Sequence, residues 1–199
     1  LHNGVSIPKE LCSPCSHQDI LFLGRLDANK SPDVLLRASR NALAVYPDIR
    51  LIFGGDGDLD RYKTIAQELE VADRCDFLGW VAGDDKERLF EQAGVYCLPS
   101  KNEAMPMSVM EAMAHGVPVI STRVGGVPQL IEDGVDGFLM DVDDVEGLSD
   151  LLLKVTGSSE LRGKIGFAGR RKIEDKFSIH AAIEELVDIY QGLYEEACA

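Results

Sequence analysis

The sequence has little positive charge and no long hydrophobic run. Among its 199 residues, 20 are Lys or Arg and 34 are Asp or Glu, which gives a formal net charge of −14. Binding to a nucleic-acid backbone needs clustered Lys and Arg, so nucleic acid is not an expected partner. No apolar stretch approaches the ~20 residues of a membrane span, and no signal peptide is visible. We therefore expect any anionic ligand to be held in a local basic pocket.

Cysteine is also scarce. The five cysteines are an odd number, without the density of a secreted disulfide scaffold, so we expect a protein of the reducing cytoplasm. Cys12 and Cys15 form a lone CxxC, and no second CxxC or paired histidine motif supplies the further ligands that zinc would need. Cys75 and Cys97 fall in apolar strand patterns, where we expect them to act as packing residues. The sequence therefore predicts no metal site.

Length and composition indicate one domain of ordinary size. Hydrophobic residues make up 45% of the chain and charged residues 27%, as is normal for a globular domain. Strand-like apolar runs alternate with helical patterns along the chain, without internal repeats. This alternation predicts an α/β fold, a Rossmann-like parallel sheet of about six strands with helices on both faces. Because the chain begins at Leu1 rather than Met, we expect it to be a piece of a longer protein.

The expected elements can be given by residue range. The strands are expected at 19–24, 50–55, 75–79, 95–98 and 118–120, with a sixth after the glycine-punctuated loop that starts at 132. The helices are expected from about 31 to before 47, after 58 through 70, and at 84–93, 106–116, 128–131, 145–155, 161–177 and 178–196.

The stretch VYCLPSKNEAMPMSVMEAMAHGVPVIS, residues 95–121, carries the most specific pattern. Its helix is expected to start at Pro106, which has no N–H to leave unpaired, and to stop at Gly116. Glu103 then lies in the loop before the helix and Glu111 lies within it. Eight residues at ~100° each return to within ~80° of the starting direction, so both carboxylates can face one crevice. That crevice lies at the carboxyl end of a parallel strand, where α/β sheets bind ligands and a helix N-terminus favours phosphate.

Two glutamates eight apart are weak evidence alone, because a loop acid and a surface helix acid are common. The surrounding phrases, PSxxE, seven residues and then EAMAxGxPVI, resemble the E-x7-E signature of retaining glycosyltransferases with the GT-B fold, of the family-four (glycosyl transferases group 1) class. The resemblance spans essentially the whole chain, with HNGV at its start. It implies the carboxyl-terminal half of a glycosyltransferase of hexosyltransferase type, which moves a sugar from a nucleoside diphosphate donor to an acceptor hydroxyl with the anomeric configuration kept.

Two cations bracket the turn after the first expected strand. Arg25 and Lys30 resemble the family's G-R-x5-K phrase, in which both residues grip the donor diphosphate and stabilise charge on the leaving group. A diphosphate carries about two negative charges and needs such charge-assisted donors. The family often has Gly after the lysine, where this chain has Ser31. Because two cations take this task, the resemblance implies that no metal or other cofactor is needed.

The resemblance also assigns acidic and base-contacting positions. It implies a catalytic role for Glu103 in orienting the sugar, and it implies that Glu111 holds the ribose hydroxyls. Val81, in a phrase similar to FLGxV, is implied to lie beside the nucleotide base. Trp80 could stack on that base, but we expect a partly buried packing residue. GGDG at 54–57 fails the dinucleotide-binding spacing, so we expect its glycines to permit a tight turn near the crevice.

The start of the helix departs from the family pattern. Many members read E-x-F-G, whereas this chain has Pro106 where the family often points a backbone N–H at the donor. Amide contacts to the donor are therefore expected from Met105, Met107 and Ser108. His115 is expected to be a helix-end residue, favourable near the negative end of the helix dipole.

The expected organisation is an interdomain linker region (1–18), a donor-binding domain (19–177) and a carboxyl-terminal helix (178–199) that packs on an absent amino-terminal domain. Besides the sugar donor, the implied partners are that domain and, through it, the inner face of a membrane; the acceptor is not identified. Because a GT-B active site lies between two domains, we expect the isolated chain to be inactive. Two alternatives remain open: a non-catalytic nucleotide-sugar-binding or partner-docking module, and a sugar-nucleotide epimerase of the same fold.

Overall fold

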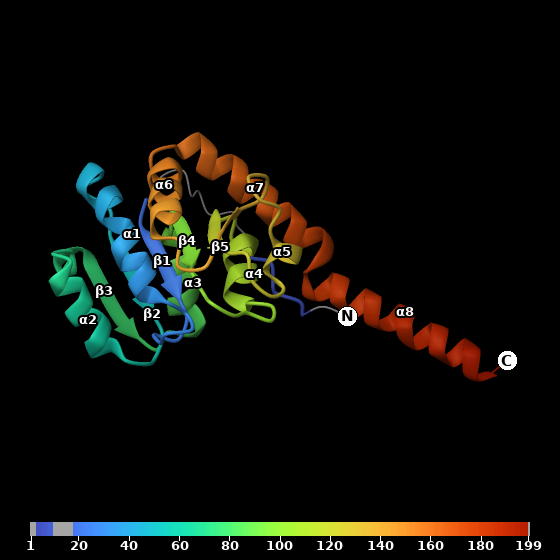
Figure 1. Ribbon diagram of the computed structural model, residues 1–199. Coiled ribbons are helices and arrows are strands. Elements are labelled where there is room, and N and C mark those ends of the chain that lie inside the picture. The colour runs from blue at the N-terminus through green and yellow to red at the C-terminus, as the bar shows by residue number, and fades with distance from the viewer. Residues whose placement is uncertain (1–2, 10–17, 199) are drawn as a thin grey trace.

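The computed structural model describes residues 3–9 and 18–198, in which six parallel strands form one sheet in the order β3-β2-β1-β4-β5-β6 (Figure 1). The strands are β1 (Ile20–Leu23), β2 (Leu51–Gly54), β3 (Cys75–Gly79), β4 (Val95–Leu98), β5 (Val119–Thr122) and β6 (Phe138–Met140). The predicted parallel α/β sheet is confirmed. The bounds of β3 and β4 agree with those expected from the sequence, and β5 runs two residues further than expected, to Thr122.

Helices cover both faces of the sheet. They are α1 (Pro32–Val45), α2 (Leu59–Glu68), α3 (Gly83–Gln92), α4 (Met107–Ala114), α5 (Val127–Leu130), α6 (Val145–Thr156), α7 (Ser159–Lys176) and α8 (Ile179–Cys198), with a 3-10 turn, η1 (Ala72–Arg74), before β3. No helix in the described part of the chain is both long and apolar enough to cross a membrane.

The hydrophobic strand sequences follow from burial on two faces. Every residue of β1, β4 and β5 is buried, so these strands are apolar runs rather than alternating ones. The core extends outward through aromatic rings: Phe22 contacts Phe53, whose ring stacks on Phe77 of the edge strand β3 with centroids 4.8 Å apart. Cys97 is fully buried and Cys75 is partly buried against the core, as expected of packing residues. Cys12 and Cys15 lie outside the described residues.

The chain reverses its direction across the sheet between β1 and β4. From β1 it steps to β2 and β3 on one side, and from β4 it steps to β5 and β6 on the other. Because parallel crossovers are right-handed, these opposite directions place α1 and α2 on one face and α4 and α5 on the other. The carboxyl ends of β1 and β4 therefore form the topological switch point, where ligands of open α/β sheets bind.

The start and end of α4 differ from the prediction. The helix begins at Met107, because Pro106 has an extended ψ of 113° and serves as the N-cap, with its carbonyl accepting from Val109 and Met110. It ends at Ala114, before Gly116 takes the left-handed φ of 75° that closes the helix. Proline suits the cap for the reason that it suits a first turn: neither position needs its N–H.

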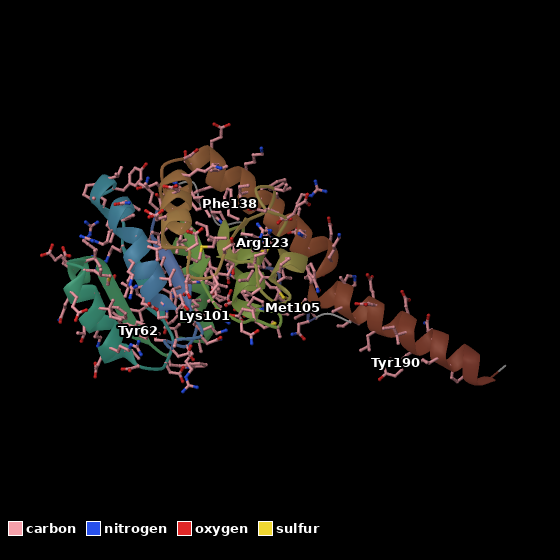
Figure 2. All side chains as sticks on the ribbon, viewed as in Figure 1. Tyr62, Lys101, Met105, Arg123, Phe138 and Tyr190 are labelled. Carbon is pink, nitrogen blue, oxygen red and sulfur yellow. The ribbon has the colours of Figure 1, made fainter. Side chains whose placement is uncertain are left out.

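The last helix extends beyond the rest of the molecule, and Figure 2 shows Tyr190 on its protruding part. Its exposed apolar side chains are Ile179, Ile183, Val187, Ile189, Tyr190, Leu193 and Tyr194. At its base, Val5 exchanges backbone hydrogen bonds of 2.9 and 3.0 Å with Phe177 and Ile179, so the amino-terminal segment lies against the α7–α8 junction.

Candidate active site at the switch point

Two loops meet where β1 and β4 end. The Lys101 N–H, in the loop after β4, donates to the Asn29 carbonyl, in the loop after β1, at 2.7 Å. The Asn29 side-chain amide donates in return to the Asn102 carbonyl at 3.2 Å. In Figure 2, Lys101 and Met105 lie toward the end of the sheet at which the strand arrows point. The loops that carry the two predicted cations and Glu103 therefore form one connected rim.

The loop after β1 positions Lys30 through a local turn. Asp27 Oδ1 accepts the backbone N–H groups of Asn29 at 3.0 Å and Lys30 at 2.9 Å. The next residue, Ser31, adopts a left-handed φ of 51° as the N-cap of α1. Glycine adopts this conformation without strain, which gives a physical reason for the glycine often found there in the resembling family.

Lys30 reaches across the switch point to Glu103. The distance from Lys30 Nζ to Glu103 Oε1 is 2.5 Å, and Glu103 is only 8% exposed. The loop after β5 supports the acid: the Gly126 N–H donates to the Ala104 carbonyl at 2.8 Å. A Cβ on Gly125, whose φ is +50°, would collide with the Glu103 carbonyl oxygen. Three loops thus fix a nearly buried carboxylate beside one ammonium group.

Arg25 lies in the same loop as Lys30 and is exposed. No side chain in the described ranges, 3–9 and 18–198, makes a hydrogen bond or ion pair with its guanidinium. Its neighbour Leu26 is bound on both sides by the GGDG turn: Leu26 donates to the Asp56 carbonyl at 2.7 Å and accepts from Asp58 at 3.0 Å. Gly57 takes a φ of +119°, and a Cβ there would strike the Leu26 carbonyl. The tight turn expected of these glycines is confirmed.

The second acid of the motif pairs with a different lysine. Glu111 Oε1 lies 2.8 Å from Lys86 Nζ of α3, with both side chains about a quarter exposed. Glu111 also lines a pocket of about 360 Å³, formed mainly by α4, the start of α8 and residues 4–8. Glu103 is not among the residues of this pocket. The two carboxylates thus belong to separate ion pairs, one at the switch point and one between α3 and α4.

The residues predicted to lie beside the nucleotide base follow β3. Val81 is partly buried at the carboxyl end of β2, where a Cβ on Gly54 would come within 2.7 Å of its side chain. Trp80 is 76% exposed, so the expectation that it packs is wrong. The preceding Gly79 turns the chain with a φ of +71°, and β3 has only one neighbouring strand, which leaves the indole uncovered. Its stacking on a base stays a prediction.

The first turn of α4 presents backbone N–H groups. Those of Met107 and Ser108 make no hydrogen bond to any described residue, as is usual for the first residues of a helix. The Ser108 hydroxyl is bound instead to the Tyr96 hydroxyl at 2.7 Å, and Tyr96 is also bonded to the Leu23 carbonyl. Burial raises the pKa of Tyr96, which keeps this phenol neutral. Met105 is partly buried against the core.

His115 is the C-cap of α4, as expected of a helix-end residue. Its Nδ1 lies 2.8 Å from the Glu111 carbonyl, its Nε2 lies 2.9 Å from Glu87 Oε2, and its ring stacks on Phe90. These contacts tie α4 to α3. The buried imidazole ring therefore has a structural role in the packing of α3 against α4.

Three further side chains near the site were not identified from the sequence. Lys86 pairs with Glu111, and Lys101 pairs with Asp143 in the loop after β6 at 2.8 Å. Ser100 is fully buried, and its hydroxyl has no partner within the described part of the chain. Single lysines and serines carry no periodic signal, and their contacts depend on which loops the sheet order brings together. Across residues 3–9 and 18–198, no three His, Cys, Asp or Glu residues are grouped as a metal site.

Comparison with known families matches residues 7–172 to Glycosyl transferases group 1. A D-inositol 3-phosphate glycosyltransferase of Saccharomonospora viridis is 34% identical over 182 residues, covering 86% of this chain and 42% of that protein. Spore coat protein SA of Bacillus subtilis is 30% identical over 181 residues, covering 86% of this chain and 48% of that protein. The chain spans about half the length of the curated relatives it matches.

Solved structures show the same fold. Sucrose-phosphate synthase of Thermosynechococcus elongatus has a TM-score of 0.81 and 25% identity, covering 92% of this chain and 47% of that chain. Anabaena HepE, in a crystal structure with UDP, has a TM-score of 0.80 and 21% identity over 88% of this chain and 49% of that one. The C-terminal domain of a Glycosyl Transferase Group 1 Family Protein (LpcC) from Francisella tularensis has a TM-score of 0.75 and 22% identity, with 87% of this chain matching 96% of that chain.

Proposed function

The chain belongs to the group 1 family of glycosyl transferases, and from that membership we propose that it is the donor-binding half of a retaining glycosyltransferase of hexosyltransferase type. The whole enzyme moves a sugar from a nucleoside diphosphate sugar to an acceptor hydroxyl. The bond from the anomeric carbon to the diphosphate breaks, and its electron pair stays with the diphosphate. The acceptor oxygen bonds the same face of that carbon, and its proton passes to the leaving diphosphate.

The Lys30–Glu103 pair at the switch point is the observation that carries this proposal. An ammonium group has three N–H donors, so one can hold Glu103 while the others face phosphate oxygens. Arg25, in the same loop, adds a planar guanidinium that can bind two phosphate oxygens at once. Two cations and a buried acid at the carboxyl ends of β1 and β4 fit a ligand that combines a diphosphate with a sugar.

Each predicted residue has a role in this proposal. Arg25 and Lys30 stabilise the charge that develops on the leaving diphosphate, an electrostatic task for which no divalent metal or other cofactor is required. Glu103 orients the sugar, and its contacts strengthen as the anomeric centre becomes positively charged. Glu111 holds the ribose hydroxyls, and Val81 lies beside the base.

Backbone groups complete the proposed donor site. The N–H groups of Met105, Met107 and Ser108 approach the donor at the amino end of α4, where the helix dipole also favours negative charge. The apolar side chains of α8 pack on the amino-terminal domain, which supplies the acceptor site. The whole enzyme acts in the cytoplasm, at the inner face of a membrane through that domain.

Calorimetry of the chain with UDP-, GDP- and ADP-sugars in the presence of EDTA tests the proposal. UDP is the first nucleotide to examine, because HepE has been crystallised with it. We expect binding without metal and no transfer by the chain alone. Robust transfer by the purified chain would contradict a site shared between two domains. Conversion of sugars without any acceptor would indicate an epimerase, and a full-length protein that binds donor without transferring it would indicate a binding module.

A further inference from the structure

Lys86 pairs with Glu111, the acid that binds the ribose hydroxyls in the proposed function. Its Nζ lies 2.8 Å from Glu111 Oε1, a distance typical of a charge-assisted hydrogen bond. The other carboxylate oxygen, Oε2, has no hydrogen-bond partner among residues 3–9 and 18–198. A carboxylate accepts through both oxygens, so Glu111 is fixed by one oxygen and open at the other.

The lysine comes from the helix that follows the proposed base-binding loop. Lys86 lies in the first turns of α3, five residues after Val81. A second contact of α3 with α4, between Glu87 and His115 at 2.9 Å, keeps the two helices together. The Phe90 ring stacked on His115, with centroids 4.8 Å apart, adds to this packing. These contacts hold α3 against α4 without Lys86. The Lys86–Glu111 ion pair is therefore not needed to join the helices, and it can serve to orient the Glu111 carboxylate.

We propose that Lys86 is a positioning residue that aims the Glu111 carboxylate at the ribose of the donor. The inference rests on the proposed function, because it requires Glu111 to bind ribose. With Lys86 present, the carboxylate has one preferred orientation, and its free oxygen accepts from the ribose hydroxyls. Without Lys86, the side chain rotates freely, and each hydroxyl contact must overcome the entropy of ordering it.

The test compares UDP with 2′,3′-dideoxyuridine 5′-diphosphate, which lacks both hydroxyls. Dissociation constants are measured for the wild-type chain and for Lys86→Met, Lys86→Arg, Glu111→Ala and Lys63→Met; if GDP or ADP binds more tightly, that nucleotide and its dideoxy form are used. Lys63→Met is the matched control for charge, because Lys63 lies on α2 and pairs only loosely with exposed Asp60 at 3.9 Å.

Wild type should prefer UDP over its dideoxy form by about tenfold or more, the scale of hydrogen bonds to a charged group. Glu111→Ala should reduce that preference to about twofold or less. Lys86→Met should reduce it at least threefold and leave the affinity for the dideoxy form unchanged. Lys86→Arg and Lys63→Met should keep the wild-type preference. A structural role alone would lower both affinities together.

Three results would overturn the inference. An unchanged preference in Lys86→Met, beside a lost preference in Glu111→Ala, contradicts the role of Lys86 and leaves the proposed function standing. Tighter UDP binding by Lys86→Met shows that the lysine covers Glu111 rather than aims it. A wild-type chain with no preference, or with no affinity for any of the three nucleotides, removes both the ribose role of Glu111 and this inference.

Discussion

The ammonium group of Lys30, in the loop after β1, lies 2.5 Å from the carboxylate of Glu103, in the loop after β4. The two residues are 73 positions apart in the sequence, and only the sheet order brings them together. Because Glu103 is nearly buried, removing Lys30 would leave a buried carboxylate without a counter-charge. The pair therefore links the stability of the domain to the site at which the donor is proposed to bind.

Removal of Lys30 should destabilise the chain because it leaves Glu103 without a counter-charge. We expect Lys30→Met to lower the free energy of unfolding by ~1–3 kcal/mol, and the double variant Lys30→Met/Glu103→Gln to recover part of that loss. Urea denaturation of the two single variants and the double variant measures the coupling. Losses that simply add would show that the two groups do not interact.

Substitution of Gly125 should displace the loop that carries Glu103. Gly125→Ala combines a left-handed φ of +50° with a collision against the Glu103 carbonyl, so it should cost more than ~2 kcal/mol of stability and weaken donor binding. The matched control is Gly134→Ala: its φ is +76° but nothing lies within 4 Å of the added Cβ, so ~1 kcal/mol is expected. Thermal unfolding of the two variants checks the difference, and equal losses would contradict the account.

Sequence patterns predicted the order and type of the helices and strands because apolar runs and glycine or proline stops are local signals. The run VYCL, for example, is the strand Val95–Leu98 as expected. Pro106 was misplaced by one position because a helix cap and a first turn tolerate proline equally. Trp80 was misjudged because its burial depends on β3 being an edge strand, which no local pattern reveals.

The candidate site was predictable as a set of residues but not as a set of contacts. The family resemblance assigned donor binding to Arg25, Lys30, Glu103 and Glu111, and these assignments stay predictions. It did not indicate that Lys86 pairs with Glu111. Such pairings depend on which helix packs beside α4, and this follows from the long-range crossover between β3 and β4.

Acidic pH should lower the stability of the fold through one carboxylate, Asp76 of the edge strand β3, which pairs with Arg50 just before β2. Arg50 binds both oxygens of Asp76, at 2.5 and 2.7 Å, and this hydrogen bonding holds the pKa of Asp76 below its ordinary value. A lowered folded-state pKa stabilises the fold above the unfolded value of ~3.9, and this contribution disappears as pH falls through the folded value.

Asp76→Asn tests this pH dependence. Both side chains of the pair are about 40% exposed, so the variant should lose only ~0.5–1 kcal/mol at pH 7. Urea titrations of wild type and Asp76→Asn should begin to converge below pH ~4 and meet once wild-type Asp76 has taken up its proton in the folded state. A difference that does not shrink as pH falls below ~4 would rule out this linkage.

The two glutamates of the motif should separate binding from chemistry in the full-length enzyme. Glu111→Ala should weaken nucleoside diphosphate binding by ~1.5–3 kcal/mol, because a charged acceptor for the ribose is lost. Glu103→Gln should lower kcat strongly but leave nucleoside diphosphate affinity within about threefold, since the free nucleotide has no sugar. Steady-state kinetics and calorimetry measure both effects. If Glu103→Gln loses affinity and keeps kcat, the two roles are exchanged.

The central claim is that this chain binds a nucleoside diphosphate through the cations at its switch point. Calorimetry of UDP, GDP and ADP with the wild-type chain and Arg25→Ala, in EDTA, tests it most directly. Arg37→Ala is the matched control, because Arg37 is an exposed α1 residue that pairs with Asp33 of the same helix. We expect wild type and the control to bind equally, and Arg25→Ala to lose at least ~1.5 kcal/mol, about tenfold in affinity. Undiminished binding by Arg25→Ala would contradict the claim.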